Sequence, residues 1–146
     1  MAAKRFVTQK PIVYCIDGTN LLRDAWFDEK VPEHQEDAGA GDFLKWLTTI
    51  QAAPTHTSKA FRVVFDGPPR DLAGRRLKPK GLDVFFSREE TADDVLIGQV
   101  RFLKTRQERV ILVTSDSDLA TSARREGVRT ITPHDFLMIF QAVIVD

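Results

Sequence analysis

The sequence predicts an α/β fold in which a doubly wound, mostly parallel sheet lies between two layers of helices. Short apolar runs alternate with amphipathic segments along the chain, which is typical of strand-helix-strand units joined by right-handed crossovers. The apolar runs are continuous, as expected of strands buried on both faces of a parallel sheet. Three runs end at an aspartate, namely Asp17, Asp66 and Asp116. We therefore expect the strand order 3-2-1-4-5, with these acids at one edge of the sheet.

The chain has the size of one domain. Its 146 residues are enough to bury a single core, so we expect residues 1–146 to form one domain with residues 1–10 as an N-terminal extension. Basic and acidic side chains number 21 each, and this balance says nothing about an acidic partner. The N-terminus lacks the apolar core of a secretory signal, and no apolar run is long enough to cross a bilayer. We expect a cytoplasmic protein without membrane contact, in which the single cysteine, Cys15, is a buried apolar filler.

The central strand is expected in the stretch IVYCIDGTNLL, where it begins at Ile12 and ends at Asp17. The residues LLRDAWF that complete and follow this stretch predict a short helix, with Thr19 or Asn20 as its N-cap. The segment 28–42 is rich in acids and small residues and contains proline and glycine. We expect a mobile loop there.

The next elements are a helix and two strands. Apolar residues recur at helical spacing over 43–50, which predicts an amphipathic helix that ends before Pro54. The second strand is expected at 61–66, where Gly67 and two prolines close it with a turn. The third strand is expected at 82–86, a short apolar run.

A helix is expected after the third strand, and it carries ETADD in its first turn. Either Ser87 with Glu90 or Thr91 with Asp94 would form its capping box. The apolar residues of its core side are Val95, Leu96, Val100 and Leu103.

Two further strands, at 110–114 and 128–131, are expected on either side of the helix LATSARRE, which Gly127 closes as a C-terminal cap. Thr132 and the proline after it supply the N-cap and first-turn proline of a last helix, DFLMIFQ. The apolar tail 143–145 leaves three alternatives open, which are an edge strand, a cover for the sheet and a contact in a homodimer.

The strand-end acids predict a metal site. In the expected order Asp66, Asp17 and Asp116 end three adjacent strands about 5 Å apart. Asp93 or Asp94, at the start of the helix after the third strand, would lean over the same rim. Carboxylates this close stay ionised in a dry cleft only if a cation neutralises them, and an all-oxygen donor set favours Mg²⁺ or Mn²⁺.

Each of these polar residues also has a structural alternative. Aspartate after a strand is a common turn former and N-cap, and the first-turn acids Asp94 and Asp118 favour the helix dipole. Glu90 suits a capping box better than metal contact. Asn20 adds an amide that could orient a carboxylate, bind a phosphate oxygen or cap the short helix. Three strand-end acids at one rim favour the functional interpretation.

A basic stretch follows the second strand and is the other functional hint. Its cations are Arg70, Arg75, Arg76, Lys78 and Lys80. Opposed by Asp71 alone, these five cations give a local charge of plus four. Such a stretch is often a solvated loop, but its position after Asp66, on the rim that carries the acids, favours contact with a phosphate backbone. Arg88 is expected to join this surface.

Other chemistries lack their motifs. None of the three histidines lies beside a strand-end acid, so a histidine base has no support. The sequence contains neither a nucleophile elbow nor a glycine-rich phosphate loop. A phosphatase or phosphotransferase with Asp17 or Asp66 as nucleophile is a further alternative, although neither acid is followed two residues later by a second one.

The motifs also resemble a known family. IDGTN, VVFDG, ETADD, VTSDSD and GVRTITP occur in the order found in the NYN domain of the PIN-like nuclease superfamily, and the subgroup they resemble is YacP-like. The resemblance covers roughly Ile12–Phe140. Each motif is short, but their common order is specific. The resemblance implies a metal-dependent ribonuclease fold with acids grouped at the strand ends.

Carried over by position, the resemblance also implies roles for individual residues. The implied catalytic residues are Asp17, Asp93, Asp116 and Asn20. Asp118 matches a second acid of relatives with an SDSD-type motif, and Asp118 or Asp66 would complete the metal shell. Thr19 stands where an aromatic residue is common, a departure that concerns substrate contacts rather than the acids.

We therefore expect a Mg²⁺- or Mn²⁺-dependent ribonuclease that hydrolyses RNA phosphodiester bonds with a metal-activated water. The basic stretch would hold the RNA backbone. The alternative from another class is a non-catalytic RNA-binding module that recruits partners through the segment 28–42 or the apolar tail. Retention of every matched acid counts against this module. RNA is thus the expected partner, and ribosome association is raised by the resemblance alone.

Overall fold

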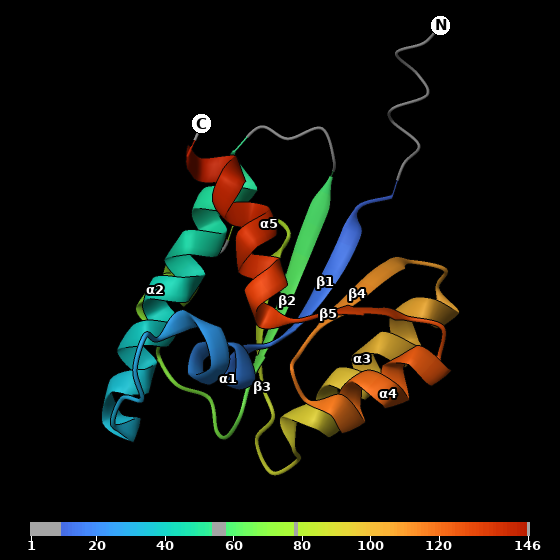
Figure 1. The fold of residues 1–146 in the computed structure, drawn as a ribbon, viewed down its shortest axis with the longest axis horizontal. Helices are drawn as coiled ribbons and strands as arrows, with labels where there is room; N and C mark the ends of the chain where they lie inside the picture. Colours follow the sequence, from blue (N-terminus) through green and yellow to red (C-terminus); the bar gives the residue numbers. More distant parts are fainter. Residues whose placement is uncertain (1–9, 54–57, 78, 146) are drawn as a thin grey trace, which may run out of the picture.

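The computed structural model describes residues 10–53, 58–77 and 79–145, and it confirms the expected sheet (Figure 1). The strands are β1 Ile12–Asp17, β2 Lys59–Phe65, β3 Leu82–Phe86, β4 Arg109–Val113 and β5 Arg129–Ile131. They pair in the order β3-β2-β1-β4-β5, and each of these pairings is parallel.

The register aligns the strand ends that carry the acids. Asp17 lies opposite Val64 of β2, and β1 pairs with β4 as far as Val113. Asp66 and Asp116 therefore follow the carboxyl ends of the two strands that flank β1. This is the adjacency that the sequence predicts.

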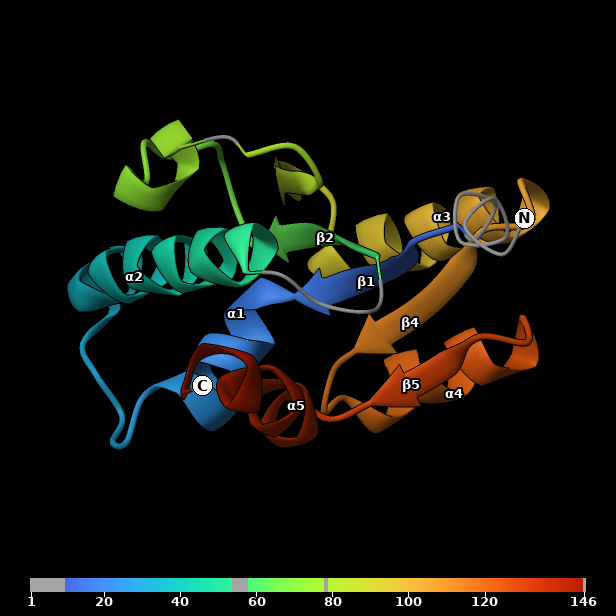
Figure 2. The ribbon, with the colours of Figure 1, turned by 90° about the horizontal axis from the view of Figure 1, so that it is seen from above.

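Helices cover both faces of the sheet, so the three-layer prediction is confirmed (Figures 1 and 2). The helical elements are α1 Gly18–Leu21, the π-helical turn η2 Leu22–Trp26, α2 Glu33–Ala52, the 3-10 helix η3 Ala73–Leu77, α3 Ala92–Thr105, α4 Ser117–Arg125 and α5 Pro133–Val145. α1, α2 and α5 pack on one face, and α3 and α4 pack on the other.

The two faces have different cores. On the first face Tyr14 and Phe61 contact Phe136 and Phe140 of α5, with ring centroids 5.2–5.9 Å apart in edge-on arrangements. On the second face Cys15 is fully buried among aliphatic side chains, as the sequence predicts. Burial raises the pKa of its thiol to about 12, so Cys15 is an inert filler.

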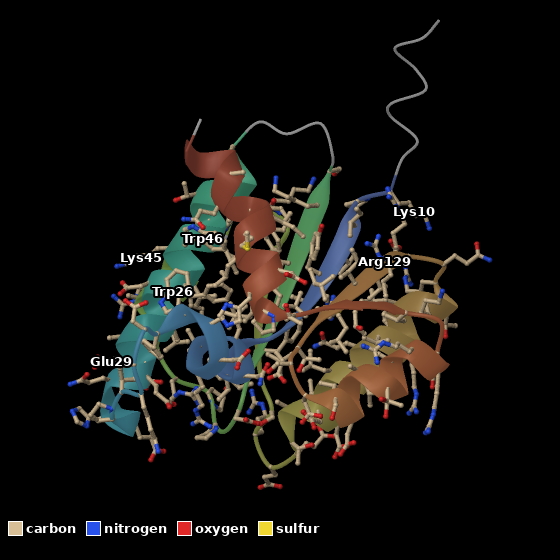
Figure 3. All side chains as sticks on the ribbon, viewed as in Figure 1. Lys10, Trp26, Glu29, Lys45, Trp46 and Arg129 are labelled. Atoms are coloured by element: carbon tan, nitrogen blue, oxygen red, sulfur yellow. The ribbon has the colours of Figure 1, made fainter. Side chains whose placement is uncertain are left out.

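The short element η2 is anchored to α2 by aromatic packing. The Trp26 ring lies 5.2 Å from the Phe43 ring and 5.8 Å from the Trp46 ring (Figure 3). The turn that follows the end of β1 is thereby held in place by a helix from a later part of the chain.

The prediction of a loop over residues 28–42 is wrong beyond its first residues, because α2 begins at Glu33. Glu33 and Glu36 stand in the first turn, where negative charge is favourable at the positive end of the helix dipole. Gly39 is inside the helix for packing, since a Cβ at this position would collide with the Phe27 ring. The acids of this segment therefore suit the start of a helix, and its glycine at position 39 makes room for the Phe27 ring, so neither requires a loop.

The structure also decides between alternatives at helix ends. Thr91 is the N-cap of α3, and its hydroxyl accepts a hydrogen bond from the Asp94 N–H at 3.1 Å. The Ser87 hydroxyl accepts instead from the Gly67 N–H at 2.9 Å. Residues 143–145 continue α5, so the edge-strand alternative for the apolar tail is wrong. Within the described residues, no helix has the length and apolarity that a bilayer crossing requires.

Candidate active site

Asp17 ends β1 and is buried at the centre of the rim, with 4% of its surface exposed. The residue after it must be small, because a Cβ on Gly18 would lie 2.7 Å from the Phe65 ring. The Asp17 Oδ2 atom accepts a hydrogen bond from the Thr114 hydroxyl at 3.1 Å. This carboxylate is thus removed from water and tied to the end of the neighbouring strand β4.

Two carboxyl groups at the rim have perturbed pKa values. The pKa of Asp17 is raised from 3.8 to about 6, chiefly by burial and also by the charges of Asp93 and Asp66, while the Thr114 hydrogen bond acts in the opposite direction. The pKa of Asp93 is raised by burial and then by nearby carboxylates, first among them Asp116. These carboxylates therefore repel one another, and a bound cation would relieve that repulsion.

Asp66 and Asp116 lie at the rim, and their carboxylates also accept hydrogen bonds from the backbone at the starts of helices. The Asp66 Oδ1 atom accepts from the Ala92 N–H at 3.1 Å, and the Asp66 N–H donates to the Thr19 hydroxyl at 2.9 Å. Asp116 is the N-cap of α4 and accepts from the Leu119 N–H at 2.9 Å. The bonds from Ala92 and Leu119 each engage one oxygen of the carboxylate, Oδ1, so both side chains hold a helix end while they lie at the rim.

Asn20 ties the ends of β1 and β4 together. Its Oδ1 atom accepts hydrogen bonds from the Ser115 N–H at 2.9 Å and from the Ser115 hydroxyl at 3.0 Å. Asn20 lies inside α1, which begins at Gly18, so the alternative prediction that Asn20 is the N-cap of this helix is wrong. Through these two hydrogen bonds Asn20 fixes the position of Ser115, and so of the residues that follow β4 at the rim.

Four of the predicted acids and the asparagine converge on one cleft of about 340 Å³. The residues that line it are Asp17, Thr19, Asn20, Arg23, Asp24, Asp66, Asp93 and Asp116. Of the two neighbouring acids at the start of α3, Asp93 and not Asp94 lines this cleft. Asp118 is exposed in the first turn of α4 and is not among the lining residues, although its charge contributes to the raised pKa of Asp93.

Two lining residues, Arg23 and Asp24, have no place in the site that the sequence predicts. Both lie in η2, which the sequence anticipates as part of a short helix after β1. The available signal is positional: charged residues in the first two helical turns after a strand-end acid start from the same rim of the sheet. Which of them faces the cleft depends on the π-helical turn.

Arg70 is the predicted cation that lies beside the acidic cleft. Its Nε donates to Asp37 at 3.0 Å, and its Nη1 donates to the carbonyls of Asp66 and Pro68 at 2.9 and 2.8 Å. The guanidinium also lies over the Phe86 ring, 5.1 Å from its centroid. Arg70 is therefore held rigidly at the wall of a groove of about 780 Å³ that adjoins the cleft.

The rest of the basic set is spread more widely. Arg75 and Lys80 line a separate groove of about 550 Å³. Arg76 forms an ion pair with the acid of its own stretch. Arg88 is exposed and has a φ of 60°. Lys78 lies outside the described residues. The described part of the chain thus brings one of the predicted cations, Arg70, to a groove that shares residues with the acidic cleft.

The donor set of the cleft suits a hard divalent cation. All its anionic side chains are carboxylates. Burial, and then repulsion from neighbouring carboxylates, raises the pKa values of Asp17 and Asp93, and such a cation would offset that repulsion. Within the described ranges, however, no group of three or more His, Cys, Asp or Glu side chains is close enough to hold a metal ion as it stands. The carboxylates surround the cleft without forming a closed cage.

A parallel sheet in the order β3-β2-β1-β4-β5 between two layers of helices, with acids at the carboxyl ends of its strands, is the arrangement of the PIN-like fold. The chain belongs to the YacP-like NYN domain family, whose sequence profile matches residues 14–145.

Two crystal structures of Rae1 (YacP) from Bacillus subtilis share this fold. For a Trp-to-Leu mutant the TM-score is 0.67 at 20% identity, with 90% of this chain and 76% of that chain covered. For a second structure of the protein the TM-score is 0.65 at 18% identity, with 90% and 74% covered. At this identity the likeness shows the fold alone. No curated protein matches the chain.

Proposed function

We propose that this chain is a metal-dependent ribonuclease that hydrolyses RNA phosphodiester bonds at the acidic cleft. The observation that carries the proposal is the convergence of Asp17, Asp66, Asp93 and Asp116 on one cleft at the strand ends. Membership of a PIN-like nuclease family supports it, since such nucleases generally use divalent metals. RNA is the proposed partner on the same ground.

Mg²⁺ or Mn²⁺ would be held by Asp17, Asp93 and Asp116, with Asp66 or Asp118 completing the shell. A bound cation of this kind supplies Lewis acidity, which activates water for attack on a phosphodiester. The raised pKa values of two of these carboxyls indicate that the cleft is poised to gain a positive charge.

The chain's own residues would prepare the site. The Thr114 hydroxyl fixes one oxygen of Asp17 and lowers its pKa, which favours the ionised form. Asn20 holds the end of β4 through Ser115 and so positions the loop that leads to Asp116. Arg70, rigid at the neighbouring groove, would contact the RNA backbone.

Adjacent acids of α3 provide the test. Asp93 lines the cleft and Asp94 does not, so Asp93→Asn should lower Mn²⁺-dependent cleavage of mixed RNAs by roughly 10–100-fold or more. Asp94→Asn, the matched control, should retain most of the activity. A chelator should stop cleavage by the wild type. Equal activity of the two variants, or RNA binding without any cleavage, would contradict the proposal; the second result would favour a non-catalytic RNA-binding module.

A further inference from the structure

Arg23 is the one cation among the described residues that line the acidic cleft. It lies in η2, a π-helical turn, and such turns are frequent at functional sites. Its side chain is 59% exposed, so an incoming ligand can reach the guanidinium. The position is a wall of the cleft and of the adjoining groove of about 780 Å³.

The Arg23 guanidinium is oriented by a carboxylate of α2. Its Nε donates to Glu36 Oε1 at 2.9 Å, and its Nη2 donates to Glu36 Oε2 at 3.0 Å. A guanidinium has five N–H donors, so this fork leaves three for another acceptor. Because Trp26 packs against α2, the element that carries Arg23 and the helix that carries Glu36 are fixed relative to each other.

A second arginine held by a carboxylate of α2 lies on the wall of the adjoining groove. This arginine is Arg70, and it pairs with Asp37, the residue after Glu36. Two arginines, each held by one of two consecutive acids, thus stand on a groove that shares Thr19 and Asp66 with the acidic cleft. A chain with regularly spaced phosphates could contact both arginines while it crosses the cleft.

We propose that Arg23 is a substrate-binding residue, which contacts an RNA backbone phosphate next to the phosphodiester in the acidic cleft. Glu36 is its partner in the absence of RNA. Water reaches the exposed Arg23 side of this ion pair and screens it, and a phosphate offers a guanidinium the same bidentate geometry as a carboxylate, so the phosphate can share or replace Glu36. This inference rests on the proposed function, because it takes RNA as the substrate.

The first experiment measures binding without turnover. A fluorescein-labelled single-stranded RNA is titrated with chelator-treated protein at several salt concentrations. Arg23→Ala should weaken binding about three- to tenfold and lower the slope of log Kd against log salt by about 0.7, the value for one contact with a single strand. The control is Arg101→Ala, which removes an equally exposed arginine from an ion pair with Glu126 between α3 and α4. It should bind like the wild type.

The second experiment tests the role of Glu36. Glu33 lines the same groove, so Glu33→Gln removes the same charge without removing the fork to Arg23. Glu36→Gln should strengthen RNA binding more than Glu33→Gln does. That difference should vanish in an Arg23→Ala background, because the freed guanidinium is its cause.

The results separate this inference from the proposed function. If Arg23→Ala leaves both the affinity and the salt slope unchanged while the wild type cleaves RNA, the role of Arg23 is refuted and the ribonuclease proposal stands. If Arg23→Ala weakens binding as expected but no cleavage occurs with Mn²⁺, the contact is supported and the ribonuclease proposal fails. Equal effects of Glu36→Gln and Glu33→Gln would refute the exchange between Glu36 and phosphate.

Discussion

Asp17→Asn should stabilise the metal-free protein at neutral pH, although it removes a proposed metal ligand. The pKa of Asp17 is about 6 in the folded protein against an ordinary 3.8, so the fold disfavours the ionised form. At ~1.4 kcal/mol per pKa unit, ionised Asp17 reduces the free energy of unfolding by about 3 kcal/mol. Asparagine has nearly the same shape and no charge, and its amide oxygen can still accept the hydrogen bond from Thr114.

The difference in stability between the wild type and Asp17→Asn should grow as the pH rises. Below the unfolded pKa of 3.8 the carboxyl group of Asp17 is protonated in both states, so wild type and Asp17→Asn should differ little. As the pH rises from there to about 6, the unfolded chain releases its proton first, and the wild type loses stability relative to the variant. The full difference is present above that interval.

Urea unfolding of chelator-treated protein at about pH 4 and about pH 7.5 measures this difference. At the higher pH the variant should gain up to ~3 kcal/mol, or about 6–12 °C in the midpoint of thermal unfolding. The control is Asp94→Asn, exposed at the start of α3, which should change stability by less than about 1 kcal/mol. A variant that is less stable than the wild type at neutral pH, or a gain that does not depend on pH, would refute the argument from burial and repulsion.

Two further variants test the contacts that position the rim. Asn20→Ala removes the acceptor of both hydrogen bonds from Ser115, so the free energy of unfolding in urea should fall by about 1–2 kcal/mol and RNA cleavage should fall as well; wild-type cleavage would show that this contact serves stability alone. Thr114→Val removes the hydrogen bond that lowers the pKa of Asp17, so that pKa should rise above about 6 in an NMR titration of the metal-free protein. Thr114→Ser keeps the hydroxyl and should leave the pKa unchanged, whereas a lower pKa in Thr114→Val would contradict the assignment.

The strand order could be predicted because the responsible signals are local and repeated. Continuous apolar runs define the strands, and the crossover rule then arranges them around the run that ends at Asp17. The start of α2 could not be predicted in the same way. Glycine favours loops in the absence of tertiary context, but Gly39 is required by the Phe27 ring, a contact that only the folded chain creates.

The candidate site also has features that the sequence predicts and features that depend on the folded structure. Proximity of the acids at 17, 66 and 116 follows from strand adjacency, which a parallel topology determines. The choice of Asp93 over Asp94 depends on which helical position faces the cleft, and the sequence leaves it open. Arg23 reaches the cleft through a π-helical turn, and no local pattern in the sequence specifies that turn. The dispersal of the basic stretch likewise depends on tertiary partners, such as the pairing of Arg70 with a residue of α2.

In the proposed function, the acids around Asp17 hold a cation that activates water for the hydrolysis of RNA. The most direct measurement compares RNA cleavage by the wild type and by Asp17→Asn at neutral pH, with Mn²⁺ and with Mn²⁺ plus an excess of chelator. We predict cleavage by the wild type with Mn²⁺ alone, and none by the variant even though its fold is more stable. Undiminished cleavage by Asp17→Asn, or cleavage by the wild type that persists in chelator, would contradict the claim.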